Sequence, residues 1–250
     1  METLTCDWGK LAWCQTPGDD PAIIFLHGTG CDCGDFAAVS AAMRRPARRL
    51  ALDFRGHGAS DTPTGPMTLS DLASDVLLLM DKLHLGPVVL AGHSLGGMVA
   101  LDVARRGGDV LGLVLLEGWT NLKGAGAFAP DRYYGGLGPD AIAAIKAKSE
   151  AMRARFTAAN WQIFWQSAQV FDAFDYLRRA TIPVLEVYGA RGCRDHMSER
   201  LCVPENPHIQ WAWVADAGHY LPTEAPARVA ALCDRFLATA LPPSAHATPP

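Results

Sequence analysis

The sequence predicts an α/β fold with a mostly parallel central sheet flanked by helices, and two observations support this. Short apolar segments of strand length alternate with longer segments in which apolar residues recur at helical spacing, as in parallel β-α-β units. Hydrophobic residues make up 49% of the 250 residues and charged residues 19%, so a large core can form. This length permits one or two domains.

Eight strands are predicted. Two short ones open the chain and are joined at Gly9. The next six are nearly continuous apolar runs, which is typical of strands buried on both faces. In order, the eight strands cover residues 4–8, 10–15, 22–28, 48–54, 87–94, 110–118, 183–189 and 209–218.

Helices are predicted between the strands. Thr68 and Asp71 have capping-box spacing, and apolar residues recur behind them at helical spacing up to Leu83. Shorter helices are expected over residues 35–43 and 95–106, and a closing helix over residues 226–240.

About sixty residues without a strand signal separate the fourth and fifth core strands. They contain helical stretches and many aromatic residues, so we predict a helical cap over residues 118–180, inserted before the penultimate core strand. Residues 1–117 and 181–241 then form the core. Residues 242–250, with the sequence PPSAHATPP, are predicted to form a disordered tail.

The composition argues against several classes of protein. Lys and Arg number 22 and Asp and Glu 26, a net charge of -4 without a long basic cluster, so we expect no nucleic-acid partner. The chain has no signal-like start and no apolar run of about 18 residues, so we expect a cytoplasmic protein without a membrane partner. Seven cysteines without paired metal-ligand spacing predict no metal site and mostly reduced thiols. A monomer or a homodimer is expected.

The candidate nucleophile is Ser94, in the sequence GHSLG at residues 92–96. A buried strand precedes this match to G-x-S-x-G and a helix follows it. A sharp turn between them forces the serine into a strained conformation and exposes its hydroxyl group. Side chains two residues to either side would clash, which explains Gly92 and Gly96.

An oxyanion hole needs two backbone N–H donors. Leu95, which follows the nucleophile, is predicted to supply one, and Thr29 in the glycine-containing loop HGTG is predicted to supply the other. His27 is expected to brace this loop. His27, Gly28 and His93 are also predicted to lie at the substrate.

These pieces resemble the α/β-hydrolase superfamily, in the group of small capped esterases, lactonases and C–C bond hydrolases. The resemblance rests on HGTG at 27–30, DFRGHGAS at 53–60, GHSLGG at 92–97 and AGHYLPTEAP at 217–226. In order and spacing these motifs span nearly the whole chain and leave only the cap unmatched. The resemblance implies a serine hydrolase that needs no metal or organic cofactor.

The general base is predicted to be His219. The triad order in this architecture is Ser, acid, His, and of the eight histidines only His219 follows the last core strand in a glycine-containing loop directly before a helix. His219 would deprotonate Ser94 for attack on an ester or lactone carbonyl, and would then activate water against the acyl-enzyme.

The acid has two candidates. Members of this superfamily usually carry an Asp three residues beyond the glycine that ends the strand after the cap, but Gly192 holds that position here and the nearest carboxylate is Asp195. The other candidate is Glu117, at the end of the strand before the cap, where a subset of haloalkane dehalogenases places the acid. A carboxylate that closes an apolar strand needs a partner, and the N–H of His219 can provide one. We favour Glu117, with Asp195 as the alternative.

The cap suggests an apolar or aromatic, ester-like small-molecule substrate. Trp119 begins the cap and is predicted to lie at the cleft. Trp161 and Trp165 recur at helical spacing, which is equally typical of residues that fasten the cap to the core. Small carboxylic esters, lactones and thioesters are the predicted substrates of this carboxylic ester hydrolase.

Other functions fit the same scaffold. A cofactor-independent dioxygenase or a C–C bond hydrolase resembles this fold, and in the dioxygenase the histidine acts on the organic substrate while Ser94 only donates a hydrogen bond. A non-enzymatic receptor for a small ligand resembles it too and retains the triad.

Overall fold

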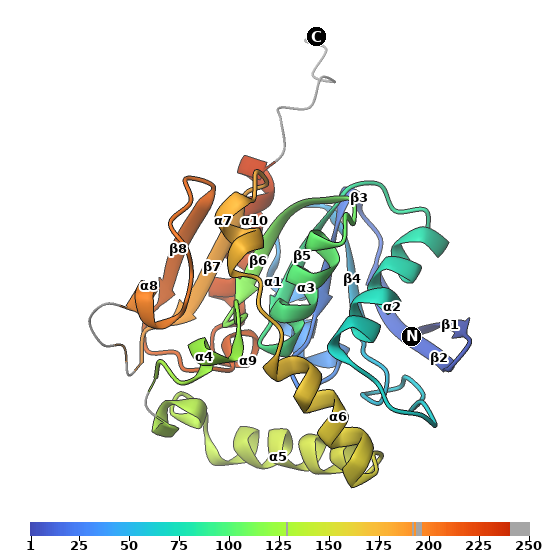
Figure 1. Ribbon diagram of the computed structural model, residues 1–250. Helices are drawn as coiled ribbons and strands as arrows, with labels where there is room; N and C mark the ends of the chain where they lie inside the picture. Colours follow the sequence, from blue (N-terminus) through green and yellow to red (C-terminus); the bar gives the residue numbers. More distant parts are fainter. Residues whose placement is uncertain (129, 192, 194–196, 241–250) are drawn as a thin grey trace.

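The computed structural model describes residues 1–128, 130–191, 193 and 197–240, and a single eight-stranded sheet runs through them (Figure 1). The strand order is β1-β2-β4-β3-β5-β6-β7-β8. The strands are β1 Glu2–Cys6, β2 Gly9–Thr16, β3 Asp19–Leu26, β4 Ala47–Asp53, β5 Val88–His93, β6 Val110–Leu116, β7 Val184–Gly189 and β8 Ile209–Val214.

Most of the strand pairs are parallel. β1 with β2 and β2 with β4 are antiparallel, and the five remaining pairs from β4 to β8 are parallel. The predicted α/β fold with a mostly parallel sheet is therefore confirmed. The first turn differs from the prediction, because Cys6 pairs with Gly9 and the turn consists of Asp7 and Trp8.

Five core strands, β3 to β6 and β8, end earlier than predicted, and a non-glycine residue with positive φ follows three of them closely. The residues that follow β5 and β6, Ser94 and Glu117, have φ of 52° and 54°, and Asp216, two residues beyond β8, has φ of 58°. A residue with a side chain rarely takes this left-handed conformation, and it interrupts the extended chain. Two of these three residues belong to the candidate site.

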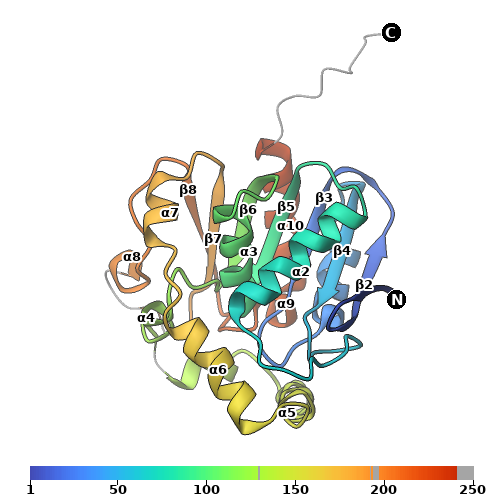
Figure 2. The ribbon, with the colours of Figure 1, turned by 45° about the vertical axis from the view of Figure 1, so that its right-hand side comes forward.

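Helices cover both faces of the sheet (Figures 1 and 2). On one face, α2 (Leu69–Lys82), α3 (Leu95–Arg105) and α7 (Phe174–Arg179) pack into the larger apolar cluster. On the other face lie α1 (Ala37–Ala42) and α10 (Pro226–Ala240). The helix predicted over residues 35–43 divides into the 3-10 helix η1 (Cys33–Phe36) and α1, because a capping box at Asp32 starts it early.

Residues 118–180, which we call the inserted segment, run between β6 and β7. They contain α4 (Leu122–Ala125), the 3-10 helix η2 (Pro130–Tyr134), α5 (Pro139–Arg153), α6 (Ala158–Gln169) and α7. Both views show α5 and α6 together beyond one end of the sheet (Figures 1 and 2). The division into a core and a cap stays a prediction, and the predicted tail at 242–250 lies outside the described residues.

Polar contacts hold α5 and the turn after it on the rest of the chain. The Lys148 ammonium lies 2.9 Å from carboxylate oxygens of both Asp32 and Asp35. The Arg155 guanidinium donates to the carbonyl oxygens of Gly58, at 3.0 Å, and Ser60. These contacts place the segment over the loops that follow β3 and β4.

The described residues also contain the short helices α8 (Met197–Arg200), before β8, and α9 (Leu221–Glu224), after it. Among the described residues, no helix combines the length and the apolar character needed to cross a membrane.

The predicted capping box at the start of α2 forms as expected. The Thr68 hydroxyl accepts from the Asp71 N–H, and the Asp71 carboxylate accepts from the Thr68 N–H. Loss of such a cap usually costs about 1 kcal/mol. We therefore expect Thr68→Ala to lower the free energy of unfolding by about that amount in urea titrations. Thr239→Ala, in an exposed turn of α10, is the control, and an equal loss in both variants would contradict this account.

Candidate active site

Ser94 lies on a tight turn between β5 and α3, with φ of 52° and ψ of −116°. Its N–H donates to the carbonyl oxygen of Leu116 at 3.0 Å, which fixes the turn to the neighbouring strand. A Cβ at Gly92 would overlap the backbone of Gly96, and a Cβ at Gly96 would overlap the carbonyl oxygen of Leu26. Both glycines are therefore required by the close approach of backbone to backbone, as the sequence predicts.

The loop after β3 approaches the serine closely. A Cβ at Gly28 would lie 3.3 Å from the Ser94 Cβ. Thr29 lines the cavity that holds Ser94, and Leu95 is the first residue of α3. Within the described residues, neither the Thr29 nor the Leu95 N–H donates a hydrogen bond to a protein group. Two such N–H groups beside Ser94 can serve a developing oxyanion.

Glu117 follows β6 directly and is fully buried. Its Oε2 lies 3.4 Å from Nδ1 of His219, and its Oε1 accepts from the Gly189 N–H at 2.8 Å. Its own N–H donates to Val187 at 2.8 Å. Of the two acids considered from the sequence, Glu117 faces His219, whereas Asp195 lies outside the described residues.

A further contact to Glu117 was not anticipated from the sequence. Arg132, in η2 of the inserted segment, donates from Nη1 to Oε2 at 3.0 Å and from Nη2 to Oε1 at 2.6 Å. Its Nη2 and Nε also donate to the carbonyl oxygens of Gly189 at 3.0 Å and Arg191 at 2.9 Å. The sequence indicates that a buried carboxylate needs a cationic or hydrogen-bonding partner, but it does not indicate that Arg132 is this partner.

Aromatic rings surround His219. The Tyr133 ring stacks on it with centroids 4.5 Å apart, and the Trp119 ring lies parallel to it at 5.8 Å. The carbonyl oxygen of His219 accepts from Nε2 of His93 at 2.9 Å. Burial lowers the pKa of His93 to about 3, so His93 stays neutral.

The loop that carries His219 is also fixed by α9. The Glu224 carboxylate accepts from the N–H groups of Gly218 at 2.7 Å and Tyr220 at 2.8 Å. Ser94 and His219 both line one cavity, but among the described residues no hydrogen bond joins the Ser94 hydroxyl to the His219 ring. Such catalytic contacts are often loose before substrate binds.

The cavity that contains Ser94 and His219 has a volume of about 610 Å³. Aromatic and aliphatic side chains form most of its wall, together with the polar residues Thr29 and Ser149. Of the residues predicted at the substrate, Trp119 and Trp165 line this cavity. Its described lining residues do not include the other four, which are His27, Gly28, His93 and Trp161.

These four residues have other contacts. Nε2 of His27 accepts from the Phe54 N–H at 3.1 Å, so His27 braces the loop, and burial lowers its pKa. Gly28 would meet His93 if it carried a Cβ, which leaves both in the interior. Trp161 packs against the rings of Phe156 and Phe164. Neighbouring position in the chain therefore did not predict which side chains face the cavity.

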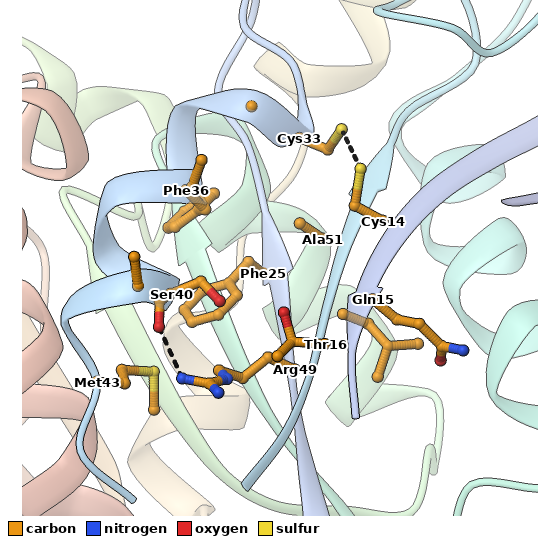
Figure 3. Close-up of a pocket in the computed structure, with 14 residues that line it drawn as sticks. Cys14, Gln15, Thr16, Phe25, Cys33, Phe36, Ser40, Met43, Arg49 and Ala51 are labelled. Carbon is orange, nitrogen blue, oxygen red and sulfur yellow. Dashed lines mark hydrogen bonds between the residues drawn. The ribbon is translucent and has the colours of Figure 1, made fainter. Parts of the chain in front are cut away.

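A second cavity, of about 370 Å³, lies between η1 and α1 on one side and β2 and β4 on the other (Figure 3). The sulfur atoms of Cys14 and Cys33 lie 3.5 Å apart at its wall, and Arg49 donates to the Ser40 carbonyl oxygen at 2.7 Å. It does not contain the Ser94 or His219 side chains. In the part of the chain that the structure describes, no group of three or more His, Cys, Asp or Glu could hold a metal.

Comparisons with known proteins identify the family and the fold. A family model described as the alpha/beta hydrolase family matches residues 23–232. A dihydrolipoyllysine-residue acetyltransferase component of an acetoin cleaving system from Pseudomonas putida is 36% identical over 95 residues, 38% of this chain and 26% of that protein. An sn-1-specific diacylglycerol lipase from Danio rerio is 38% identical over 90 residues, 35% of this chain and 28% of the lipase.

These matches span less than a third of either relative. Among solved structures, the enol-lactonase from Burkholderia xenovorans LB400 superimposes with a TM-score of 0.72 at 20% identity, covering 95% of this chain and 100% of that one. At that identity the likeness concerns the fold.

The stability of the fold should be sensitive to acid because of the buried His57 in the loop after β4. Burial lowers its pKa to about 3, so between about pH 6 and pH 4 the unfolded chain binds a proton that the folded chain does not. The free energy of unfolding should therefore decrease as the pH is lowered through this range. His57→Gln should reduce the slope of the free energy of unfolding against pH by about 1.4 kcal/mol per pH unit. Urea titrations across this range measure it, and equal slopes for wild type and variant would contradict the assignment.

Proposed function

Because the chain belongs to the alpha/beta hydrolase family, we propose that it is a serine hydrolase that cleaves a small carboxylic ester, lactone or thioester through an acyl-enzyme on Ser94. The observation that carries this proposal is the strained turn that presents Ser94 to the cavity shared with His219, whose Nδ1 faces Glu117 at 3.4 Å. Strained backbone of this kind persists where the surrounding structure holds it, often at functional sites.

The proposed reaction assigns each group a role. His219 takes the proton of the Ser94 hydroxyl as its oxygen attacks the carbonyl carbon, and then gives that proton to the departing alcohol. The N–H groups of Thr29 and Leu95 stabilise the oxyanion. Water, deprotonated by His219, releases the acid product from Ser94. Glu117 orients the imidazole and stabilises its protonated form.

The cavity wall supports a neutral, apolar or aromatic substrate. Among its described lining residues, Arg132 carries a permanent charge, but its guanidinium is 4% exposed and paired with Glu117. An anionic substrate would therefore lack a free cation to bind. Trp119, Phe128 and Trp165 offer apolar surface instead.

The acid can be identified by substitution. We expect a fluorophosphonate probe to label Ser94 and the wild type to hydrolyse p-nitrophenyl esters. Glu117→Gln should lower kcat/KM roughly a thousandfold or more, because His219 loses the group that fixes its orientation. Asp195→Asn should retain most of the activity. The measurement is kcat/KM for a p-nitrophenyl ester, determined by steady-state kinetics for both variants and the wild type.

Ser94→Ala is the control for the nucleophile. It should abolish both labelling and ester turnover. Absence of labelling and turnover in the wild type would refute the hydrolase and leave the dioxygenase or the ligand receptor. Loss of activity in Asp195→Asn alone would transfer the acid role from Glu117 to Asp195.

The two tryptophans of α6 provide a matched test of the substrate cavity. Trp165 lines the cavity and Trp161, one helical turn earlier, does not. Trp165→Ala should raise kcat/KM for a bulky acyl group relative to acetate severalfold, because it enlarges the cavity. Trp161→Ala should leave this ratio near wild type. Equal ratios in the two variants would contradict the assigned cavity wall.

A further inference from the structure

The inserted segment supplies a cation to the acid of the candidate triad. Arg132 is 4% exposed, Glu117 is fully buried, and two parallel hydrogen bonds of 2.6 and 3.0 Å join them. Bidentate arginine–carboxylate pairs fix geometry as well as charge. A carboxylate of a serine triad needs no such partner to orient a histidine, so this pair requires a reason of its own.

The carboxylate is shared unequally between Arg132 and His219. Oε1 accepts from Arg132 Nη2 and from the Gly189 N–H, at 2.6 and 2.8 Å. Oε2 accepts from Arg132 Nη1 at 3.0 Å and faces His219 Nδ1 at 3.4 Å. The guanidinium is thus the nearer cation, and it competes with a protonated imidazole for the same negative charge.

Other ionisable groups surround the pair. His219 faces His93 on β5, Tyr133 on η2 and its neighbour Tyr220. The Glu224 carboxylate lies under the same loop but is bonded to two backbone N–H groups.

On the side of Glu117, burial raises the pKa of Glu186 to about 8 and raises the pKa values of Tyr188 and Cys193. Burial likewise lowers the pKa of His93 to about 3 and raises the pKa values of Tyr133 and Tyr220. Between about pH 4 and pH 7 these groups stay neutral. Among the described residues that contact Glu117, Arg132 is therefore the permanent cation.

The same short stretch of chain also touches the base. Tyr133, the residue after Arg132, stacks on the His219 ring with centroids 4.5 Å apart. The backbone of Arg132 passes so near Gly218 that a Cβ there would overlap the Arg132 carbonyl oxygen. Two consecutive residues of the inserted segment therefore contact the acid and the base.

We propose that Arg132 is a positioning residue of the triad, which fixes the Glu117 carboxylate and limits how strongly that carboxylate stabilises protonated His219. This inference rests on the proposed hydrolase function. Its consequence is that His219 remains an unprotonated base at lower pH than it would beside an unpaired Glu117. The inserted segment then supports activity through charge as well as by forming the cavity wall.

The pH profile of the reaction tests this role. Activity should rise with pH as His219 loses its proton, so kcat/KM has an acid limb. In Arg132→Met the unpaired Glu117 should hold the proton on His219 more strongly, and the acid limb should move up by about one pH unit. Arg132→Lys retains the positive charge and should keep the limb near its wild-type position. The measurement is kcat/KM for a p-nitrophenyl ester, with fluorophosphonate labelling rates as a second readout.

Arg155→Met is the matched control. Arg155 also joins the inserted segment to the rest of the chain, but it donates to the carbonyl oxygens of Gly58 and Ser60 and to the Thr62 hydroxyl. Its loss removes an equal charge without touching Glu117. The acid limb should stay in place in this variant.

A double substitution keeps the test decisive if Arg132→Met folds poorly. Removing both charges, in Arg132→Met with Glu117→Gln, avoids an uncompensated buried carboxylate. If Arg132 acts through Glu117, the double variant should be labelled at the same rate as Glu117→Gln alone. A further loss in the double variant, or an unmoved acid limb in Arg132→Met, would overturn the inference. A wild type that is neither labelled nor active would instead refute the proposed hydrolase function.

Discussion

A fully buried negative charge at the end of β6 organises the candidate site. Glu117 is bonded to Arg132 in the inserted segment and to the Gly189 N–H at the end of β7, and it faces His219 in the loop after β8. An uncompensated buried charge costs several kcal/mol, so these partners must be present together. The inserted segment is therefore tied to the core through the residue that we propose as the acid.

The order of the strands explains why these groups meet. β5, β6, β7 and β8 are adjacent and parallel, so their carboxyl ends lie along one edge. Ser94 and Glu117 each follow a strand at positive φ, and each N–H donates to the next strand, to Leu116 and Val187. The strained backbone at these two strand ends thus turns the side chains of Ser94 and Glu117 away from the hydrogen-bonded strands of the sheet. They point into the space that the inserted segment covers.

The sequence predicts features that depend on local constraints. The serine turn follows from GHSLG, because Gly92 is required by a contact with Gly96 inside the motif, although Gly96 itself meets Leu26 on the neighbouring strand β3. The α2 capping box follows from the spacing of Thr68 and Asp71. The choice between two acids could not be made in this way, because either Glu117 or Asp195 could reach His219 by loop geometry that sequence alone does not determine.

Features that depend on distant contacts were missed. Nothing local distinguishes Arg132 from the other arginines of the inserted segment as the partner of Glu117. Trp161 and Trp165 lie on neighbouring turns of α6, and helical spacing cannot tell which one borders the cavity. His27 and His93 adjoin the site in sequence, yet their rings point into hydrogen bonds of the interior.

The central claim is that Ser94 forms a covalent acyl-enzyme in the cavity it shares with His219. The most direct measurement is rapid acid quenching of the reaction with a p-nitrophenyl ester, followed by mass spectrometry of the peptides. Our account predicts an acyl group on Ser94 that forms and decays at rates consistent with turnover. Hydrolysis of the ester without any acyl group on Ser94 would contradict it.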